Sequence, residues 1–278
     1  MDTVLDAAAG GAADGAIDAM TERDVLALRL RSYVELLSID FWVYQFLAAF
    51  PGVPKDTTFV AGSFRWSNRR LMPADKLQAK VGAIVQEANH QPRTATDDAV
   101  LAYARALASW LPKLFDLQAY YDELRFVDDE FDRGRRDSAE IAQARDELAR
   151  LRVPMRSAVL TDWRELSSDV PDSPRAIVGA AWETCIKFAD HLMAGDPPAA
   201  LTAAVSACRR SIPTVGALPA GKGGEFATTL RGAAVAIGDR MANRFMTDDS
   251  SSALAQLTRS YLELWPTLSK ASAERGLP

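Results

Sequence analysis

The side chains best suited to nucleophilic chemistry are few in this sequence: two cysteines and two histidines. Of these, Cys185 and His191 are six residues apart. On a helix that separation corresponds to a net rotation of about 240°, which places the two side chains on different faces. No Gly-x-Ser-x-Gly elbow is present. The sequence therefore predicts no nucleophilic centre, no catalytic residues and no enzyme activity.

Metal binding can be judged from the same few residues. Carboxylate-bridged centres in helical bundles take a Glu-x-x-His pair from each of two helices. Glu87 precedes His90 at this spacing, but Phe188 occupies the corresponding position before His191. No Cys-x-x-Cys pair occurs, which argues against zinc ribbons and thioredoxin-like sites. We expect neither a metal ion nor a cofactor.

One segment, residues 216–223, comes close to a phosphate-binding loop and ends in Gly221-Lys222-Gly223. Such a loop needs a Ser or Thr after the lysine to bind Mg²⁺, and a buried strand before it. Gly223 lacks the hydroxyl, and residues 209–215 do not have a strand pattern. We interpret the segment as an ordinary loop between helices.

The cysteines have a possible structural role. Gly195-Asp196-Pro197 predicts a turn between two helices, with Cys185 before it and Cys208 after it at nearly equal separation. In an antiparallel hairpin both would lie roughly 17 Å from the turn, at the same height. Either they form a disulfide, which implies an oxidising compartment, or they remain thiols packed as small hydrophobic groups. The sequence leaves both alternatives open.

The elements that must position these residues are helices, because apolar side chains recur at spacings of three and four. The strongest pattern predicts one helix over residues 97–133, about 55 Å long, with a coiled-coil-like seam. Pro112 should only kink this helix, and Gly134 is a natural stop. The seam positions are Val100, Tyr103, Leu107, Trp110, Leu114, Leu117, Tyr121, Leu124, Asp128 and Phe131.

The same pattern predicts further helices over the rest of the chain. Loops are expected at 51–72 and 211–223, which are rich in Gly, Pro or aromatic residues. The fold class is therefore all-α: an antiparallel helical bundle with long, coiled-coil-like helices. We expect residues 1–20 to form a flexible lead-in and residues 21–278 to form a single bundle domain. The other helices are expected at 21–49, 73–89, 138–152, 154–167, 174–194, 197–210, 224–245 and 250–273.

Composition narrows the function classes. A net charge of −5 argues against a nucleic-acid partner, because binding to phosphates needs an excess of clustered Lys and Arg. No stretch approaches the roughly 18 apolar residues of a membrane span. The N-terminus has neither the basic nor the apolar region of a signal peptide. We expect either a cytoplasmic protein or a sequence that begins after a removed signal.

Two polar features remain as candidate binding sites. Asp128 falls on the predicted seam and Asp40 on the equivalent phase of the first helix. A buried carboxylate there would bind a cation or line a polar pocket, or it would pair with an arginine. The second feature is the expected 51–72 loop, which interleaves aromatic residues with arginines and could bind a partner. Its candidate residues are Phe64, Arg65, Trp66, Arg69 and Arg70.

Residues 103–134 carry a recognisable string. It comprises Tyr103-Ala-Arg-Ala-Leu107, Leu111-Pro112, Tyr120-Tyr121 and the run from Phe126 through Asp128-Asp129 to Gly134. The string resembles the signature of the YiiG-like family of bacterial lipoproteins, which has no assigned function. The resemblance implies a helical domain exported to the bacterial envelope, usually behind a lipidated cysteine. That cysteine is absent from this sequence, and the family transfers no catalytic residues.

From these observations we expect a non-enzymatic periplasmic or envelope-anchored protein that binds a protein partner or a ligand, reaching a membrane only through a lipid anchor. The binding residues would be those of the 51–72 loop, or Tyr120, Tyr121, Asp128 and Asp129. One specific version is an immunity protein against a delivered toxin. The alternatives are a metal- or small-molecule-binding protein that uses Asp40, Asp128 and Asp129, and a cytoplasmic scaffold.

Overall fold

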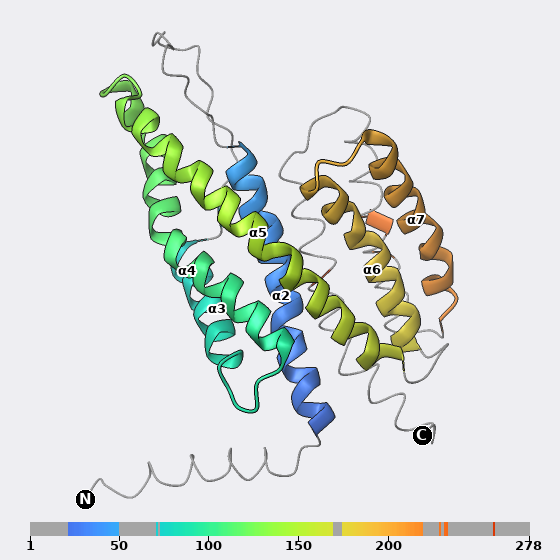
Figure 1. The fold of residues 1–278 in the computed structure, drawn as a ribbon. Helices are drawn as coiled ribbons and strands as arrows, with labels where there is room; N and C mark the ends of the chain where they lie inside the picture. The colour runs from blue at the N-terminus through green and yellow to red at the C-terminus, as the bar shows by residue number, and fades with distance from the viewer. Residues whose placement is uncertain are drawn as a thin grey trace, which may run out of the picture.

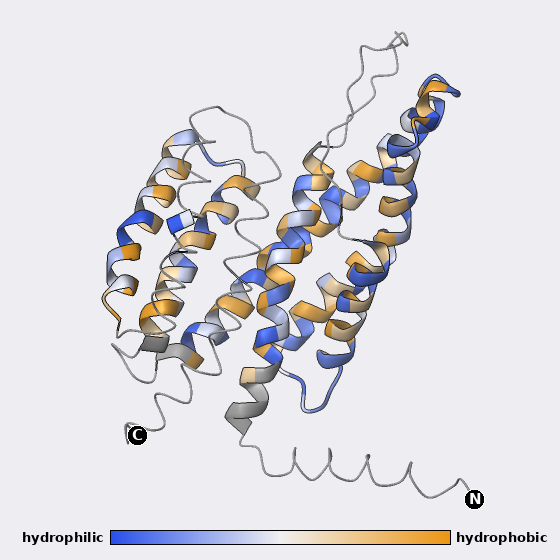
Figure 2. Cartoon of the chain, turned by 180° about the vertical axis from the view of Figure 1, so that it is seen from behind, coloured by the Kyte–Doolittle hydropathy of each residue, from blue (hydrophilic) through white to orange (hydrophobic). Residues whose placement is uncertain are grey.

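The computed structural model describes residues 22–49, 71, 73–168, 174–218, 228, 231–232 and 258. Every regular element in these ranges is a helix, which confirms the all-α bundle. Figure 2 shows hydrophilic and hydrophobic residues interspersed along each helix, as amphipathic helices require. The elements are α2 (Glu22–Ala49), α3 (Ala74–Glu87), α4 (Ala95–Asp122), the short 3-10 helix η1 (Arg125–Val127), α5 (Asp132–Ser168), α6 (Pro174–Met193) and α7 (Pro198–Gly216).

Two groups of helices pack on opposite sides of the long helix α5. α3 and α4 lie on one side of α2 and α5, and the α6–α7 hairpin lies on the other (Figure 1). α4 and α5 are antiparallel neighbours joined by the turn that holds η1. One continuous apolar cluster runs through α2, α3, α4, α5, α6 and α7. α5 is therefore the element that links the tip of the α4–α5 hairpin to the α6–α7 hairpin.

The predicted long helix is confirmed up to Asp122, and its last part, residues 123–133, is wrong. α4 begins at a capping box, in which Thr94 and Asp97 bond to each other's backbone N–H. The seam positions from Val100 to Tyr121 are buried or half-buried, as expected. The helix nevertheless ends at Asp122 rather than near residue 133, and the chain reverses. Gly134, expected to stop a helix, lies inside the first turn of α5.

Prolines also end fewer helices than expected. The predicted helices 138–152 and 154–167 are a single helix, α5, with Pro154 inside it. Met155 and Val159 are fully buried just beyond the proline, so packing compensates for the one lost backbone hydrogen bond. In the same way α7 continues through Pro213 to Gly216, into the expected 211–223 loop. The prediction of a break at these prolines was therefore wrong.

Several predictions fall outside the described residues. These are the 1–20 lead-in, most of the 51–72 loop and most of the predicted helices 224–245 and 250–273. Within the last two, Thr228, Arg231, Gly232 and Thr258 are helical. Thr258 accepts a hydrogen bond at 3.2 Å from the indole of Trp182 on α6.

Candidate functional site

The buried carboxylate of Asp40 is neutralised inside the protein. Its side chain is 0% exposed, and the Nε of Arg152 lies 2.7 and 2.9 Å from its two oxygens. The hydroxyl of Tyr103 donates a third hydrogen bond to it. Burial, and then the Asp40 charge, raise the pKa of Tyr103 well above its ordinary value, so this hydroxyl stays protonated. Asp40 thus pairs with an arginine of a neighbouring helix.

The same network reaches α6 through Arg156. This guanidinium lies 3.5 Å from Asp40 and donates at 2.6 Å to Asp190. Burial raises the pKa of Asp190 despite the opposing charge of Arg156. A small cavity beside Arg156 has mainly apolar walls, and the guanidinium already bonds to Asp190 and to a backbone carbonyl. The cavity is lined by Leu37, Ser38, Phe41, Arg156, Trp182, Ile186, Ala189 and Thr258. We interpret this centre as a structural junction.

The hairpin tip, defined here as residues 120–136, is a backbone structure of a different kind. After α4 ends, Leu124 has φ 57°, and η1 follows directly. Glu130 and Phe131 then have φ 49° and 67°, and α5 begins at Asp132. Left-handed conformations cost residues other than glycine roughly 1–2 kcal/mol each. Such strain persists only where the surrounding contacts over-determine it, and it is often found at functional positions.

Aromatic rings supply the contacts that hold the hairpin tip. Phe126 and Phe131 stack with ring centroids 4.8 Å apart, and Tyr121 lies 5.7 Å from Phe126. Tyr120 meets Tyr121 edge to face at 4.9 Å. All four side chains are buried. This aromatic cluster explains the break in the predicted helix, because Phe126 and Phe131 fold back onto the end of α4.

Asp129 ties the turn to both helices. Its carboxylate accepts a hydrogen bond at 2.7 Å from the Tyr120 hydroxyl and another at 3.1 Å from the backbone N–H of Arg133. The second bond satisfies one of the free N–H groups at the start of α5. The Arg133 guanidinium lies over the Tyr120 ring, 5.1 Å from its centroid, and bonds to Asp116 and Asp137. These charges therefore hold the turn rigid.

Ionisation at the hairpin tip follows from the same contacts. Burial, and then the hydrogen bond to Asp129, raise the pKa of Tyr120 above its ordinary value. Burial, and then the Asp129 charge, raise the pKa of Tyr121. The hydrogen bond from Arg135 lowers the pKa of Asp132. At neutral pH the tyrosines of the tip are therefore neutral, and Asp132 is charged.

Although held rigidly, the hairpin tip exposes apolar surface. Leu124 is 56% exposed and Val127 is 46% exposed, at the two ends of η1. Val153 on α5, 69% exposed, is the other large apolar side chain exposed within the described ranges. Asp128 is exposed as well, so the expectation that it lies on a buried seam was wrong. The predicted seam ends at Tyr121, because the chain leaves the helix before Asp128.

The structure does not bring Asp40 together with the Asp128–Asp129 pair. Asp40 lies beside Tyr103, and the α4 axis from Tyr103 to its end spans roughly 28 Å. Within the described residues, no group of three or more His, Cys, Asp or Glu side chains could hold a metal ion. The geometry therefore gives no support to the alternative of a shared site for Asp40, Asp128 and Asp129.

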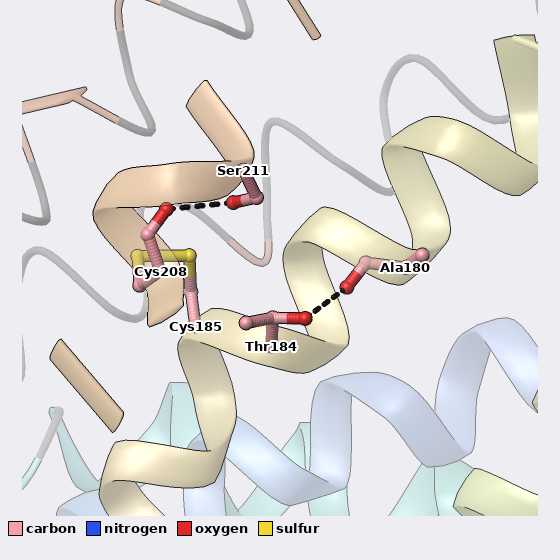
Figure 3. Close-up of a disulfide and its surroundings, with 5 residues drawn as sticks. All are labelled: Ala180, Thr184, Cys185, Cys208 and Ser211. Carbon is pink, nitrogen blue, oxygen red and sulfur yellow. Dashed lines mark hydrogen bonds between the residues drawn. A yellow bond between two sulfur atoms is a disulfide. The ribbon is translucent and has the colours of Figure 1, made fainter. Parts of the chain in front are cut away.

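Of the two alternatives for the cysteines, the structure contains the disulfide. Cys185 on α6 is bonded to Cys208 on α7, with the two Cα atoms 4.6 Å apart (Figure 3). The turn between the helices lies at Gly195, whose φ of 71° is a left-handed conformation that glycine adopts freely because it has no Cβ atom. His191 is near this turn and bonds to Asp196 at 2.7 Å. It therefore faces Asp196, in agreement with the expectation that it does not pair with Cys185.

The aromatic and basic residues Phe64, Arg65, Trp66, Arg69 and Arg70 lie outside the described residues, but the flanks of their segment are fixed. The Arg145 guanidinium donates at 2.8 Å to the carbonyl of Leu47, near the end of α2. The side chain of Gln118 accepts at 2.8 Å from the backbone N–H of Leu71. The segment between these two points thus begins and ends against α4 and α5.

Comparison with known proteins gives one match. The family model of DUF3829, described as a protein of unknown function, matches residues 71–161, about a third of the chain. This range includes α3, α4, the hairpin tip and most of α5. No curated protein and no solved structure matches the chain. In the described part, no helix has both the length and the apolar character needed to cross a membrane.

Proposed function

We propose that this protein is a non-enzymatic binding module that contacts a protein partner through its hairpin tip. The observation that carries the proposal is the exposure of Leu124 and Val127 on a turn whose backbone is strained and locked. The left-handed backbone lowers the stability of the protein, and so does the exposure of apolar side chains to solvent. A turn that combines both is more easily explained by a binding role than by a role in folding. The tip also lies inside the segment that matches the family.

The remaining polar groups support a binding role over catalysis. Asp40 is saturated by Arg152 and Tyr103, and Asp129 by Tyr120 and the start of α5. An acid or base in catalysis must be able to reach the proton that it transfers. These carboxylates instead hold helices together.

Site-specific photo-cross-linking in the native cells tests the proposal. A photoreactive amino acid is placed at Leu124, at Val127 or at the control position Val153, which is equally apolar and more exposed. We expect one protein to be cross-linked reproducibly from the two tip positions and not from the control. Equal labelling from all three positions, or none from the tip, would contradict the proposal.

For localisation, we propose the periplasm or the outer face of an envelope membrane, reached through a lipid anchor on a longer precursor. Support comes from the Cys185–Cys208 disulfide, since such bonds persist in oxidising compartments. The resemblance of residues 103–134 to envelope lipoproteins points the same way. Rapid alkylation of native cells lysed directly in denaturant tests this: we expect both cysteines to resist alkylation until a reductant is added. Alkylation of both thiols without reductant in this lysate would indicate the cytoplasm.

A more specific form of the proposed binding function is an immunity role, in which the protein partner is a toxin delivered by a neighbouring cell. It needs only a rigid contact surface and an envelope location. Co-culture of toxin-producing cells with cells that lack this protein tests it. We expect the deletion strain to be killed, the complemented strain to survive, and a Leu124→Asp variant to fail to protect while it still folds. Equal survival of the deletion strain in all co-cultures would reject the immunity version.

A further inference from the structure

The charges at the hairpin tip divide into paired and unpaired groups. Glu123 pairs with Arg125 at 3.1 Å, and Asp132 pairs with Arg135 at 2.8 Å. Asp129 is occupied by the Tyr120 hydroxyl and a backbone N–H. These three carboxylates already have their partners within the protein, so none of them needs a cation from outside.

Two carboxylates of the hairpin tip have no such partner. Asp128 and Glu130 are exposed, and no cation of the described residues lies within ion-pair distance of either carboxylate. Arg135 approaches Glu130, but its hydrogen bonds go to the Glu130 backbone carbonyl and to Asp132. The unpaired negative charge is therefore placed directly after Val127 in the chain.

The exposed apolar pair and the free carboxylates all lie in the short segment 124–130. The backbone N–H of Val127 donates at 2.9 Å to the carbonyl of Leu124, which closes a tight turn. A turn of this kind brings its first and fourth Cα atoms within about 7 Å. Phe126 between them points into the aromatic cluster and is 5% exposed. Leu124 and Val127 are both exposed at this turn, Asp128 follows Val127 directly, and the exposed Glu130 comes two residues later.

We infer that the partner is a protein with a shallow apolar recess that receives Leu124 and Val127 and is rimmed by Lys or Arg side chains opposite Asp128 and Glu130. This inference rests on the proposed function and specifies the chemistry of its partner. Complementary charge at the rim of an apolar contact steers association and selects against wrong partners. A lipid surface fits less well, because the exposed carboxylates would be repelled by anionic headgroups.

The test combines cross-linking with neutralisation of the two carboxylates. Full-length protein carrying a photoreactive amino acid at Leu124 is expressed in the native cells, with or without Asp128→Asn and Glu130→Gln. A control removes the same charge with Asp75→Asn and Asp146→Asn, two exposed aspartates on α3 and α5. The cross-linked species is then identified, and its attachment site is mapped by mass spectrometry.

We expect a protein attached at an apolar site flanked by Lys or Arg. Its yield should fall about fivefold with the tip neutralised and stay unchanged in the control, as two exposed ion pairs would predict. An attachment site without basic neighbours, or an unchanged yield, would overturn this inference and leave the proposed function intact. Cross-linking to lipid alone, or to nothing specific, would overturn both. Circular dichroism of each variant confirms that it is folded.

Discussion

Two places on the α4–α5 hairpin use the same residue types in opposite ways. At the centre, Tyr103 and Arg152 bond to Asp40, and the whole group is buried. At the hairpin tip, Tyr120 bonds to Asp129 with Arg133 stacked above, and apolar side chains stay exposed on a strained backbone. In the first arrangement the charged groups bond to one another and join helices. In the second they hold the turn that exposes Leu124 and Val127. Identical residue types therefore indicate different roles, depending on what remains exposed.

Removing the central carboxylate should have the largest effect. Asp40→Ala leaves Arg152 and Arg156 buried without their shared partner, and we expect the free energy of unfolding to fall by about 3–5 kcal/mol. Urea denaturation followed by circular dichroism measures this. Asp40→Asn is the shape-matched control and should also be strongly destabilised. A loss below about 1 kcal/mol for Asp40→Ala would show that the centre is hydrated rather than a closed junction.

The equivalent change at the hairpin tip should cost less. Asp129→Ala removes the acceptor for the Tyr120 hydroxyl and for one N–H at the start of α5, both in partly buried hydrogen bonds. We expect a loss of about 1–2 kcal/mol. The same urea experiment applies, with Asp128→Ala as a neighbour that makes no such bonds and should change stability little. If the two variants were equally stable, Asp129 would not hold the turn.

At alkaline pH, Tyr103 and Tyr120 should make the free energy of unfolding fall as the pH rises. Burial raises the pKa of Tyr103 and of Tyr120 in the folded protein. Each tyrosine therefore contributes stability that is complete below pH 10, the ordinary tyrosine pKa, and is lost as the pH rises above it. Each should cost up to about 1.4 kcal/mol per pH unit in that window. Urea midpoints at a series of pH values measure the slope. We expect Tyr103→Phe and Tyr120→Phe each to flatten it, and an unchanged slope in both would refute the argument.

The smallest effect tests backbone strain. Leu124→Gly replaces a left-handed leucine with the residue that adopts this conformation freely, while removing only exposed apolar surface. We expect the protein to gain about 0.5–1 kcal/mol in unfolding free energy. Val153→Gly, in the interior of α5, is the matched control and should lose about 0.3–0.5 kcal/mol, the difference in helix propensity between Val and Gly. A destabilised Leu124→Gly variant would mean that the leucine packs in the free protein and is not held for a partner.

Apolar periodicity predicted most of the fold, since it depends on spacing that each helix must satisfy locally. It located α2, α3, α4 and the α6–α7 hairpin, with Cys185 opposite Cys208. It failed beyond Asp122, because Leu124 and Phe131 keep the helical spacing while the chain turns without a glycine. Only the packing of Phe126 and Phe131 on Tyr120 and Tyr121 reveals that turn.

The candidate site was predicted in part. The sequence indicated Tyr120, Tyr121, Asp128 and Asp129, but the exposure of Leu124 depends on the turn and so could not be anticipated. For Asp40, the available signal was the pair Arg152 and Arg156, four residues apart on an otherwise apolar face of α5. Two arginines on one buried helix face imply a buried carboxylate on a neighbouring helix.

The bond between Cys185 and Cys208 determines what happens when the backbone is cut. Gly195 lies at an exposed turn, where a protease has good access. After a single cleavage there, helices α6 and α7 would remain covalently joined through the disulfide. Nicked molecules would then migrate as one band on a gel without reductant and as two bands with it, and they would keep the junction with α5 in place.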